Sequence, residues 1–201
     1  MNDEIQILPL IYLARHGETA WSISGQHTGL TDLPLTERGE RNARRLGERL
    51  KTETFARVFS SPLQRASRTC ELSGFGTVTS VDDDLVEWNY GDYEGKTSEK
   101  IDLQRPGREL FRDGCPGGES VEDVVARADR VIDRLRAIDG NVLLFSHGHF
   151  LLILAARWLD QDAASGRHYF LNTTALSILG YHHGQHDPVI RLWNDCNHVG
   201  D

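Results

Sequence analysis

The chain has 201 residues, of which 39% are hydrophobic and 26% are charged, and its formal net charge is −8 at pH 7. This composition is typical of one folded domain over residues 1–201, and the acidic charge argues against nucleic acid or an acidic membrane as a partner. The three cysteines lack a C-x-x-C spacing, which favours a reducing compartment and gives no sign of a zinc site.

The first apolar run, over residues 5–14, predicts a buried strand. It is too short for a membrane span, and residues 1–4 before it are acidic where a signal peptide is basic. We therefore expect a cytoplasmic protein without membrane contact.

The predicted strand over 5–14 leads into Arg15, His16 and Gly17. In open α/β sheets, ligands bind at the carboxyl ends of the strands. A guanidinium fits phosphate oxygens in pairs, an imidazole nitrogen acts as nucleophile, acid or base, and glycine admits a ligand close to the backbone. On these three residues alone, an ordinary surface pair is the better interpretation, and only the rest of the chain reverses that preference.

Loop, helix and strand signals follow in turn. Residues 20–35 are rich in Gly, Thr, Ser and Asp and predict a loop, and Thr36 then begins a helix with one apolar face. A short strand over 57–60 leads to Ser61, a predicted N-cap, with Pro62 at the first helical position.

The helix after Ser61 carries Arg65 in its first turn, within reach of a ligand at the strand ends. A further strand is expected over 77–81. The polar segment over 96–118 is broken by proline and glycine, so we expect a partly helical excursion that covers the site.

The second half of the chain repeats this alternation. Ser120 begins an amphipathic helix, and residues 141–146 predict a second buried strand that ends in His147 and Gly148. An apolar helix and two closing strands are expected over residues 150–159, 175–181 and 189–193.

Strands that alternate with helices predict an α/β fold of three layers, α/β/α, with a mostly parallel central sheet. The strands over 5–14 and 141–146 both lead into a His-Gly pair, so His16 and His147 converge if these strands are neighbours. A lone His147 would usually be a hydrogen-bonded core histidine, but the repeated pattern weakens that interpretation.

Glu87 is the carboxylate that we single out, because it lies among apolar residues at Leu85, Val86 and Trp88. Partial burial favours the protonated form, which makes Glu87 a candidate proton donor near neutral pH. A surface carboxylate beside exposed apolar residues fits the sequence equally well, and the residues alone leave both interpretations open.

The chain resembles the phosphoglycerate-mutase-like branch of the histidine phosphatase superfamily along nearly its whole length. Five ordered motifs carry this resemblance: RHGET at 15–19, GQHTGLTD at 25–32 with PLT at 34–36, SSPLQRA at 60–66, Glu87 with Tyr90-Gly91 and Glu94-Gly95, and SHG at 146–148.

The resemblance implies that His16 becomes phosphorylated, that Arg15, Arg65 and His147 bind phosphate, and that Glu87 donates the proton. It also implies the three-layer fold of that branch, with no metal and no cofactor. Further substrate contacts are expected from six residues: Ser22, Gln26, Thr28, Gly29, Tyr90 and Gly148. A homodimer is a family-level expectation.

Departures from the mutase pattern favour a phosphatase. Ser22 stands where the mutases carry Asn, and Asp113 follows Arg112 where they carry an arginine pair for a substrate carboxylate. Other motifs resemble those of fungal sedoheptulose-1,7-bisphosphatases and mycobacterial broad-specificity acid phosphatases.

We therefore expect hydrolysis of small phosphorylated metabolites, sugar phosphates or bisphosphates, through a phosphohistidine. Glu87 would then act as a base that activates water. A phosphoglycerate mutase is the alternative, and a phosphate-binding module without catalysis is a further one.

A metal site is a rival hypothesis, built on His147 and His149 or on His182, His183 and His186. No carboxylate or cysteine completes either group at a familiar zinc spacing, so solvated loop histidines are the favoured interpretation for the second group.

Overall fold

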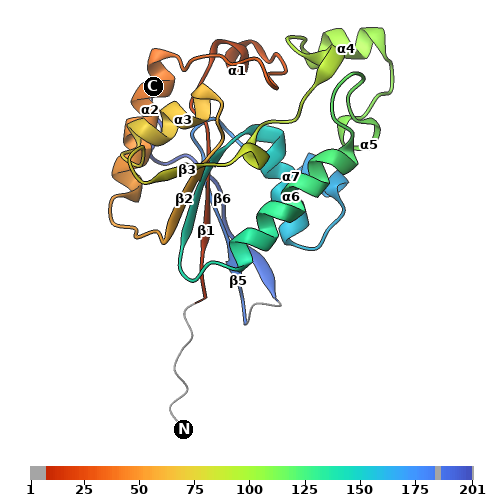
Figure 1. Cartoon of the computed structure of the whole chain (residues 1–201). Coiled ribbons are helices and arrows are strands. Elements are labelled where there is room, and N and C mark those ends of the chain that lie inside the picture. Colours follow the sequence, from red (N-terminus) through yellow and green to blue (C-terminus); the bar gives the residue numbers. More distant parts are fainter. Residues whose placement is uncertain (1–7, 184–186, 201) are drawn as a thin grey trace.

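The computed structural model describes residues 8–183 and 187–200. Its centre is a six-stranded sheet in the order β3-β2-β4-β1-β5-β6 (Figure 1). The first four strands in this order run parallel, and β5 and β6 are antiparallel to their neighbours, which confirms the mostly parallel sheet. The strands are β1 (Ile11–Arg15), β2 (Arg57–Ser60), β3 (Thr79–Val81), β4 (Val142–Ser146), β5 (Leu176–Tyr181) and β6 (Pro188–Asp195).

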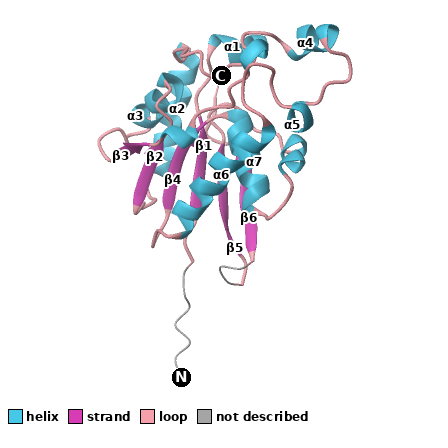
Figure 2. Cartoon of the chain, turned by 45° about the vertical axis from the view of Figure 1, so that its right-hand side comes forward, coloured by secondary structure: helices cyan, strands magenta, loops and turns pink. Residues whose placement is uncertain are grey.

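Helices cover both faces of the sheet (Figure 2). Side chains alternate along a strand, so Ile11 and Leu13 pack in the core formed with α6 and α7, whereas Tyr12 and Ala14 pack in the core formed with α2 and α3. The three-layer prediction is therefore confirmed. The helices are α1 (Ala20–Ser24), α2 (Glu37–Leu50), α3 (Gln64–Leu72), α4 (Ser98–Gln104), α5 (Leu110–Asp113), α6 (Val121–Arg136) and α7 (Gly148–Trp158), with short 3-10 turns η1 (Asp83–Leu85), η2 (Gly91–Tyr93) and η3 (Ala163–His168).

Capping side chains begin the two long amphipathic helices where the sequence predicts. The Thr36 hydroxyl accepts a hydrogen bond from Gly39 N at 3.0 Å, and Ser120 forms a reciprocal capping box with Asp123. Both caps satisfy N–H groups that the first turn of a helix leaves without partners.

Several element boundaries differ from the predicted ones. The first strand begins at Ile11, and residues 5–7 of the predicted span lie outside the described residues. The Ser61 N-cap is wrong: α3 begins only at Gln64, and its N-cap residue is Leu63. The Ser61 hydroxyl bonds His147 Nε2 at 2.7 Å and also accepts from Leu63 N at 3.3 Å, so it connects a buried histidine to the turn before the helix.

The excursion over 96–118 is partly helical, as expected, with α4 and α5 joined by loops. It lies at the end of the molecule where β1 ends, on the same side as α1 (Figure 1). None of the helices in the described part of the chain combines the length and the apolar composition that crossing a bilayer requires.

Arg127 on α6 fixes the segment that carries Glu87. Its guanidinium donates to both carboxylate oxygens of Glu119 at 2.8 and 3.0 Å, and to the carbonyls of Asp84 and Val86 at 2.7 and 3.0 Å. Arg127 is only 8% exposed, so these bonds are shielded from water. The arginine therefore connects α6 to the backbone just before Glu87.

We expect Arg127→Met to lower the free energy of unfolding by about 2–4 kcal/mol, because it removes the ion-pair partner of the half-buried Glu119 carboxylate and the donor to the carbonyls of Asp84 and Val86. Urea denaturation measures this loss. The control is Arg130→Met, which removes an exposed arginine paired with Asp84 and should cost about 0–1 kcal/mol. Equal costs for the two substitutions would contradict the role of Arg127.

Candidate active site

A cavity of about 570 Å³ opens where β1 and β4 end. This volume is within the usual range for sites that enclose a small molecule. Its inner part is lined by Arg15, His16, Glu87, Gly148 and His149. Its outer wall comes from α1 and the loop after it, from the excursion over 96–118 and from the residues after η3: Trp21, Ser22, Gln26, His27, Thr28, Ser98, Asp102, Arg108, Glu109, Leu110, Phe111, Arg167, Tyr169, Phe170 and Leu171.

His16 lies at the inner end of the cavity. Its Nδ1 lies 2.7 Å from the carbonyl of Gly17. A carbonyl only accepts, so Nδ1 carries the proton and Nε2 keeps its lone pair. Burial, with the charges of Arg15 and Arg65, holds the pKa of His16 well below its usual range, so the ring is neutral at pH 7.

The two predicted histidines converge as expected. β1 pairs in parallel with β4, which sets Arg15 opposite Ser146 and brings the ring centroids of His16 and His147 to 5.2 Å. His147 is fully buried, and it does not line the cavity. Its Nδ1 accepts from Arg65 Nε at 3.1 Å, so the proton lies on Nε2, which donates to Ser61.

Arg65 also lies beneath the cavity wall with none of its surface exposed. Besides His147, it donates to the carbonyls of Thr28, Gly29 and Thr31 at 2.8–3.1 Å. In this structure the guanidinium therefore holds the loop after α1 in place. Arg15 differs, because it lines the cavity and its buried Nε has no protein partner.

The side chain of Glu87 lies against the N-terminal end of α7. Its carboxylate accepts from the backbone N–H groups of Trp88, His149 and Phe150 at 2.9–3.1 Å. Glu87 is only 5% exposed, so these three backbone donors hold its carboxylate in one position beside the cavity.

Gly148 lies between the two charged groups of the inner cavity. A Cβ at this position would meet Arg15 Cζ at 3.4 Å and Glu87 Oε2 at 3.5 Å. The absence of a side chain at Gly148 therefore leaves space beside the Arg15 guanidinium and the Glu87 carboxylate.

Four of the other expected substrate contacts line the cavity, and each of the four has a side-chain hydrogen bond within the protein. The Ser22 hydroxyl completes the capping box with Thr19, Gln26 Nε2 donates to Gly95 O at 2.8 Å, and the Tyr90 hydroxyl bonds His149 Nδ1. The fourth is Thr28, whose hydroxyl donates to Gln26 O at 3.2 Å.

Gly29 is not brought to the cavity. Its N–H donates to the Glu94 carboxylate, and a Cβ there would lie only 2.6 Å from Glu94 Oε2. Glycine is required at this position for close packing of the loop.

The sequence analysis missed most of the outer wall. His27, Arg108, Phe111, Arg167 and Phe170 line the cavity, although none of them was expected to contact substrate. Four lie in segments whose path over the sheet depends on tertiary packing. The HTG sequence at 27–29 is the only local signal that could have indicated one of them, His27.

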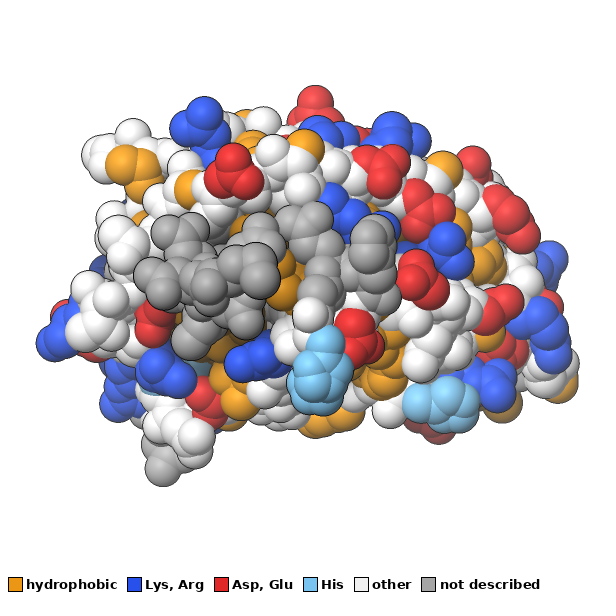
Figure 3. All heavy atoms as spheres, turned by 90° about the horizontal axis from the view of Figure 1, so that it is seen from below, with side chains coloured by type: hydrophobic (Ala, Val, Ile, Leu, Met, Phe, Trp, Pro, Cys, Tyr) orange, Lys and Arg blue, Asp and Glu red, His pale blue; other side chains and the backbone are white. Residues whose placement is uncertain are grey.

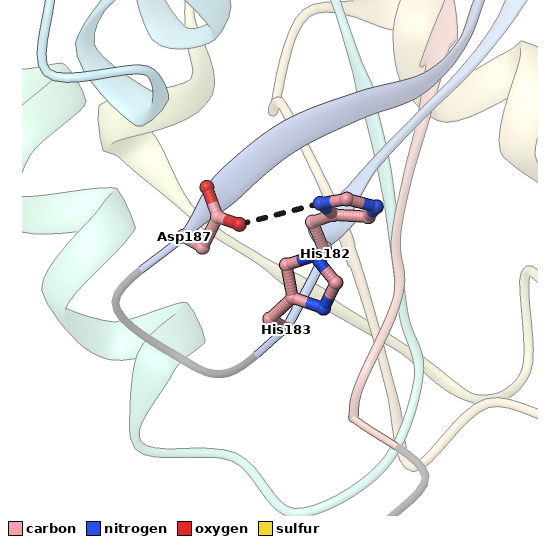
Figure 4. Close-up of side chains that lie close together, drawn as sticks. All are labelled: His182, His183 and Asp187. Atoms are coloured by element: carbon pink, nitrogen blue, oxygen red, sulfur yellow. Dashed lines mark ion pairs between the residues drawn. The ribbon is translucent and has the colours of Figure 1, made fainter.

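The proposed metal pair of His147 and His149 does not form, because both ring nitrogens of His147 already bond Ser61 and Arg65. Three exposed side chains do gather elsewhere: His182, His183 and Asp187 have ligand atoms within 4.8 Å of one another (Figure 4). His186 lies outside the described residues. β5 is antiparallel to β1, so this cluster lies at the opposite end of the sheet from His16.

The end of the molecule that carries this cluster is seen in Figure 3. Acidic and basic side chains intermingle there, and histidines are exposed among them (Figure 3). Among the described residues visible on this face, no broad field of one charge stands out (Figure 3).

Comparison with known proteins assigns the family. Residues 11–196 match the model of the histidine phosphatase superfamily (branch 1). The chain belongs to this superfamily. The motifs in the sequence therefore indicated the correct family. They contain the predicted nucleophile, the two arginines, the carboxylate and the second histidine.

Curated relatives cover nearly the whole chain. An acid phosphatase of Mycobacterium tuberculosis is 38% identical over 180 residues, 87% of each chain. Sedoheptulose 1,7-bisphosphatase of Saccharomyces cerevisiae is 36% identical over 252 residues, 92% of this chain and 93% of its own. A protein of Photorhabdus laumondii named "Probable phosphoglycerate mutase GpmB" is 31% identical over 205 residues, 94% of each.

A solved structure confirms the fold. The protein of an open reading frame from Mycobacterium tuberculosis superposes with a TM-score of 0.88 and 37% identity, over 92% of this chain and 97% of its own. The two phosphatase-named relatives are more similar than the mutase-named one, and the chain is a phosphoric monoester hydrolase of this superfamily.

The buried histidines make the stability of the protein sensitive to acid. Burial lowers the pKa of His149 to about 4. Between pH 6.5 and 4, the unfolded chain therefore binds a proton at this histidine that the folded chain does not bind. Stability is thus retained above pH 6.5 and lost as the pH falls toward 4.

We expect His149→Gln to reduce the fall in unfolding free energy between pH 6 and pH 5 by up to about 1.4 kcal/mol. Urea denaturation at the two pH values measures this difference. The same substitution at the exposed His183 should leave the pH dependence unchanged. An unaltered pH dependence in His149→Gln would show that the ring already binds a proton in the folded state.

Removal of metal should leave phosphatase activity unchanged, because the three-ligand cluster lies at the far end of the sheet from the cavity. Activity measured before and after treatment with a chelator, in the wild type and in His183→Asn, tests this expectation. Loss of activity that zinc restores would contradict it.

Proposed function

We propose that the protein is a metal-independent phosphatase that hydrolyses small phosphorylated metabolites through a phosphohistidine at His16. The observation that carries this proposal is the lone pair of His16 Nε2, which lies in the cavity beside Arg15 and Glu87. Phosphoryl transfer requires mainly positioning and charge stabilisation, and these three groups supply both.

In the first step, His16 Nε2 attacks phosphorus and the ester P–O bond breaks. Glu87, in its neutral form, gives its proton to the leaving oxygen, and Arg15 stabilises the negative charge of the phosphoryl oxygens. Arg65 and His147, buried behind the nucleophile, add positive charge and hydrogen-bond capacity if a phosphate draws the Arg65 guanidinium forward.

In the second step, Glu87 is a carboxylate and takes a proton from water. The water oxygen attacks phosphorus, the P–N bond to His16 breaks, and inorganic phosphate leaves. The three backbone N–H groups around Glu87 hold it in one place for both steps. Its roles as acid and as base then differ only in whether the carboxyl group holds a proton.

The two reaction steps described above use no metal ion. In the described residues, the one group of three close metal-ligating side chains is the exposed cluster at His182, His183 and Asp187, remote from His16. The inner cavity offers Arg15 in the role of the positive charge.

For substrates we propose sugar phosphates or sugar bisphosphates. The cavity is far larger than a phosphate group, and its outer wall alternates charged side chains with aromatic ones. The similarity to a sedoheptulose 1,7-bisphosphatase supports the same class.

A cytoplasmic location is supported by the three free cysteines, and the homodimer stays a prediction.

The mutase alternative is less favoured. Arg112, which stands where the mutases carry an arginine pair, bonds Asp113 at 2.6 and 2.7 Å and does not line the cavity. The structure therefore places no carboxylate-binding arginine pair at this position.

His16→Ala should lower kcat at least about 10⁴-fold on every substrate, because no other group forms the phosphoenzyme. Phosphate release is measured with sugar monophosphates, sugar bisphosphates, 3-phosphoglycerate and p-nitrophenyl phosphate, with His183→Ala as the matched control. Rapid acid-free quenching with labelled substrate should trap label on the wild type and none on His16→Ala.

Two outcomes would overturn the proposed function. One is hydrolysis that persists in His16→Ala. The other is a wild type that isomerises 3-phosphoglycerate without releasing phosphate from any substrate.

A further inference from the structure

Two histidines outside the expected catalytic set face the cavity side by side. His149 follows Gly148 in the first turn of α7, and His27 lies in the loop after α1. Their rings are nearly parallel, with an interplanar angle of 11° and centroids 6.1 Å apart. Tyr90 packs edge-on against both rings, and Phe111 packs against His149, which holds the pair in position.

The hydrogen bonds of His149 decide where its proton lies. Its Nδ1 bonds the hydroxyl of Tyr90, which is 2% exposed. Burial and the charge of Glu87 raise the pKa of Tyr90 well above its usual range, so the phenol keeps its proton. In the described residues its hydroxyl has no acceptor other than His149 Nδ1, and donation to Nδ1 is the arrangement that leaves this buried hydrogen bonded. The neutral His149 ring therefore carries its own proton on Nε2.

His27 has the opposite arrangement. Its Nδ1 lies 3.0 Å from the carbonyl of Lys96, and because a carbonyl only accepts, Nδ1 carries the proton. Burial lowers the pKa of His27, so the ring is neutral at pH 7 and Nε2 keeps a lone pair.

Both Nε2 atoms are accessible from the cavity. Neither has a hydrogen-bond partner in the described part of the chain, and neither is among the buried atoms without partners, which include Arg15 Nε. The cavity wall thus presents one donor on His149 and one acceptor on His27, both uncharged.

We propose that His149 and His27 form a subsite that binds the hydroxyl groups of a polyhydroxylated phosphate ester. A hydroxyl both accepts and donates, so one hydroxyl or two adjacent ones satisfy the His149 donor and the His27 acceptor together. A carboxylate fits worse, because it only accepts and therefore cannot donate to the His27 acceptor.

Tyr90 becomes a positioning residue in this arrangement. It acts through His149 by fixing the proton on Nε2, although the sequence analysis expected it to contact substrate directly. The backbone N–H of the same histidine bonds Glu87 at 3.1 Å, so the subsite has a fixed position relative to the proton donor. This inference rests on the proposed function, because it concerns the body of the substrate whose phosphate meets His16.

The test compares a sugar monophosphate with its deoxy analogues, each lacking one hydroxyl. For the wild type, kcat/KM should fall about tenfold for the analogue that lacks the bound hydroxyl. The ratio of kcat/KM for the sugar phosphate to kcat/KM for this analogue should approach one in His149→Phe, His27→Phe and Tyr90→Phe. His183→Phe, outside the cavity, serves as the matched control and should keep the ratio of the wild type.

A wild type that does not discriminate between the sugar and any deoxy analogue would overturn the subsite. So would a ratio that persists in both histidine variants. Either result with the deoxy analogues can occur in a protein that still hydrolyses p-nitrophenyl phosphate in a reaction that requires His16. In that case the proposed function stands and only this inference is wrong.

A second measurement does not depend on turnover, and its decisive observation is made on the wild type. Imidazole nitrogen shifts in NMR spectra of the wild type should show His149 protonated at Nε2 and His27 protonated at Nδ1. Tyr90→Phe should give His149 a mixture of both tautomers. The reverse tautomers in the wild type would overturn the proposal.

Discussion

The parallel pairing of β1 with β4 is the constraint on which the site depends. With Arg15 opposite Ser146, the two strands end at the same level, and the next residue of each is a histidine. His16 N also bonds Ser146 O at 2.9 Å, which continues the ladder into the site. A slip of one residue would turn each side chain to the other face of the sheet and separate the histidines.

Around that pairing, the protein uses backbone groups more than side chains to arrange its chemistry. Gly17 O selects the tautomer of His16, three N–H groups hold Glu87, and loop carbonyls hold Arg65. Backbone dipoles in a packed fold move little, so they orient charged and reactive groups without adding charge of their own. Arg127 extends this support by fixing the backbone before Glu87 to α6.

The strands, the long helices and the inner cavity could be predicted because their signals are local. A continuous apolar run, a Thr or Ser cap, and a His-Gly pair after a strand are each visible within a few positions. Ser61 shows where such reasoning fails, because α3 begins three residues after it and its hydroxyl bonds a histidine that is 86 residues away. That partner is not visible in the local sequence.

The outer wall could not be predicted for the same reason. His27 and His149 are 122 positions apart along the chain, and only tertiary packing stacks their rings. Gly29 was expected to meet substrate, but its surroundings are filled by Glu94 and Trp88. Close packing and ligand contact both call for glycine, and the sequence does not distinguish them.

The outer wall also suggests how relatives of this protein diverge. The residues from 98–111 and 167–171 that surround the cavity mouth belong to no strand of the sheet, and they carry none of the ladder that aligns His16. Lengthening a surface loop costs little folding free energy, since closure entropy grows only slowly with length. Insertions there would reshape the mouth for a new metabolite while the phosphoryl chemistry stays intact, so one scaffold can serve many pathways.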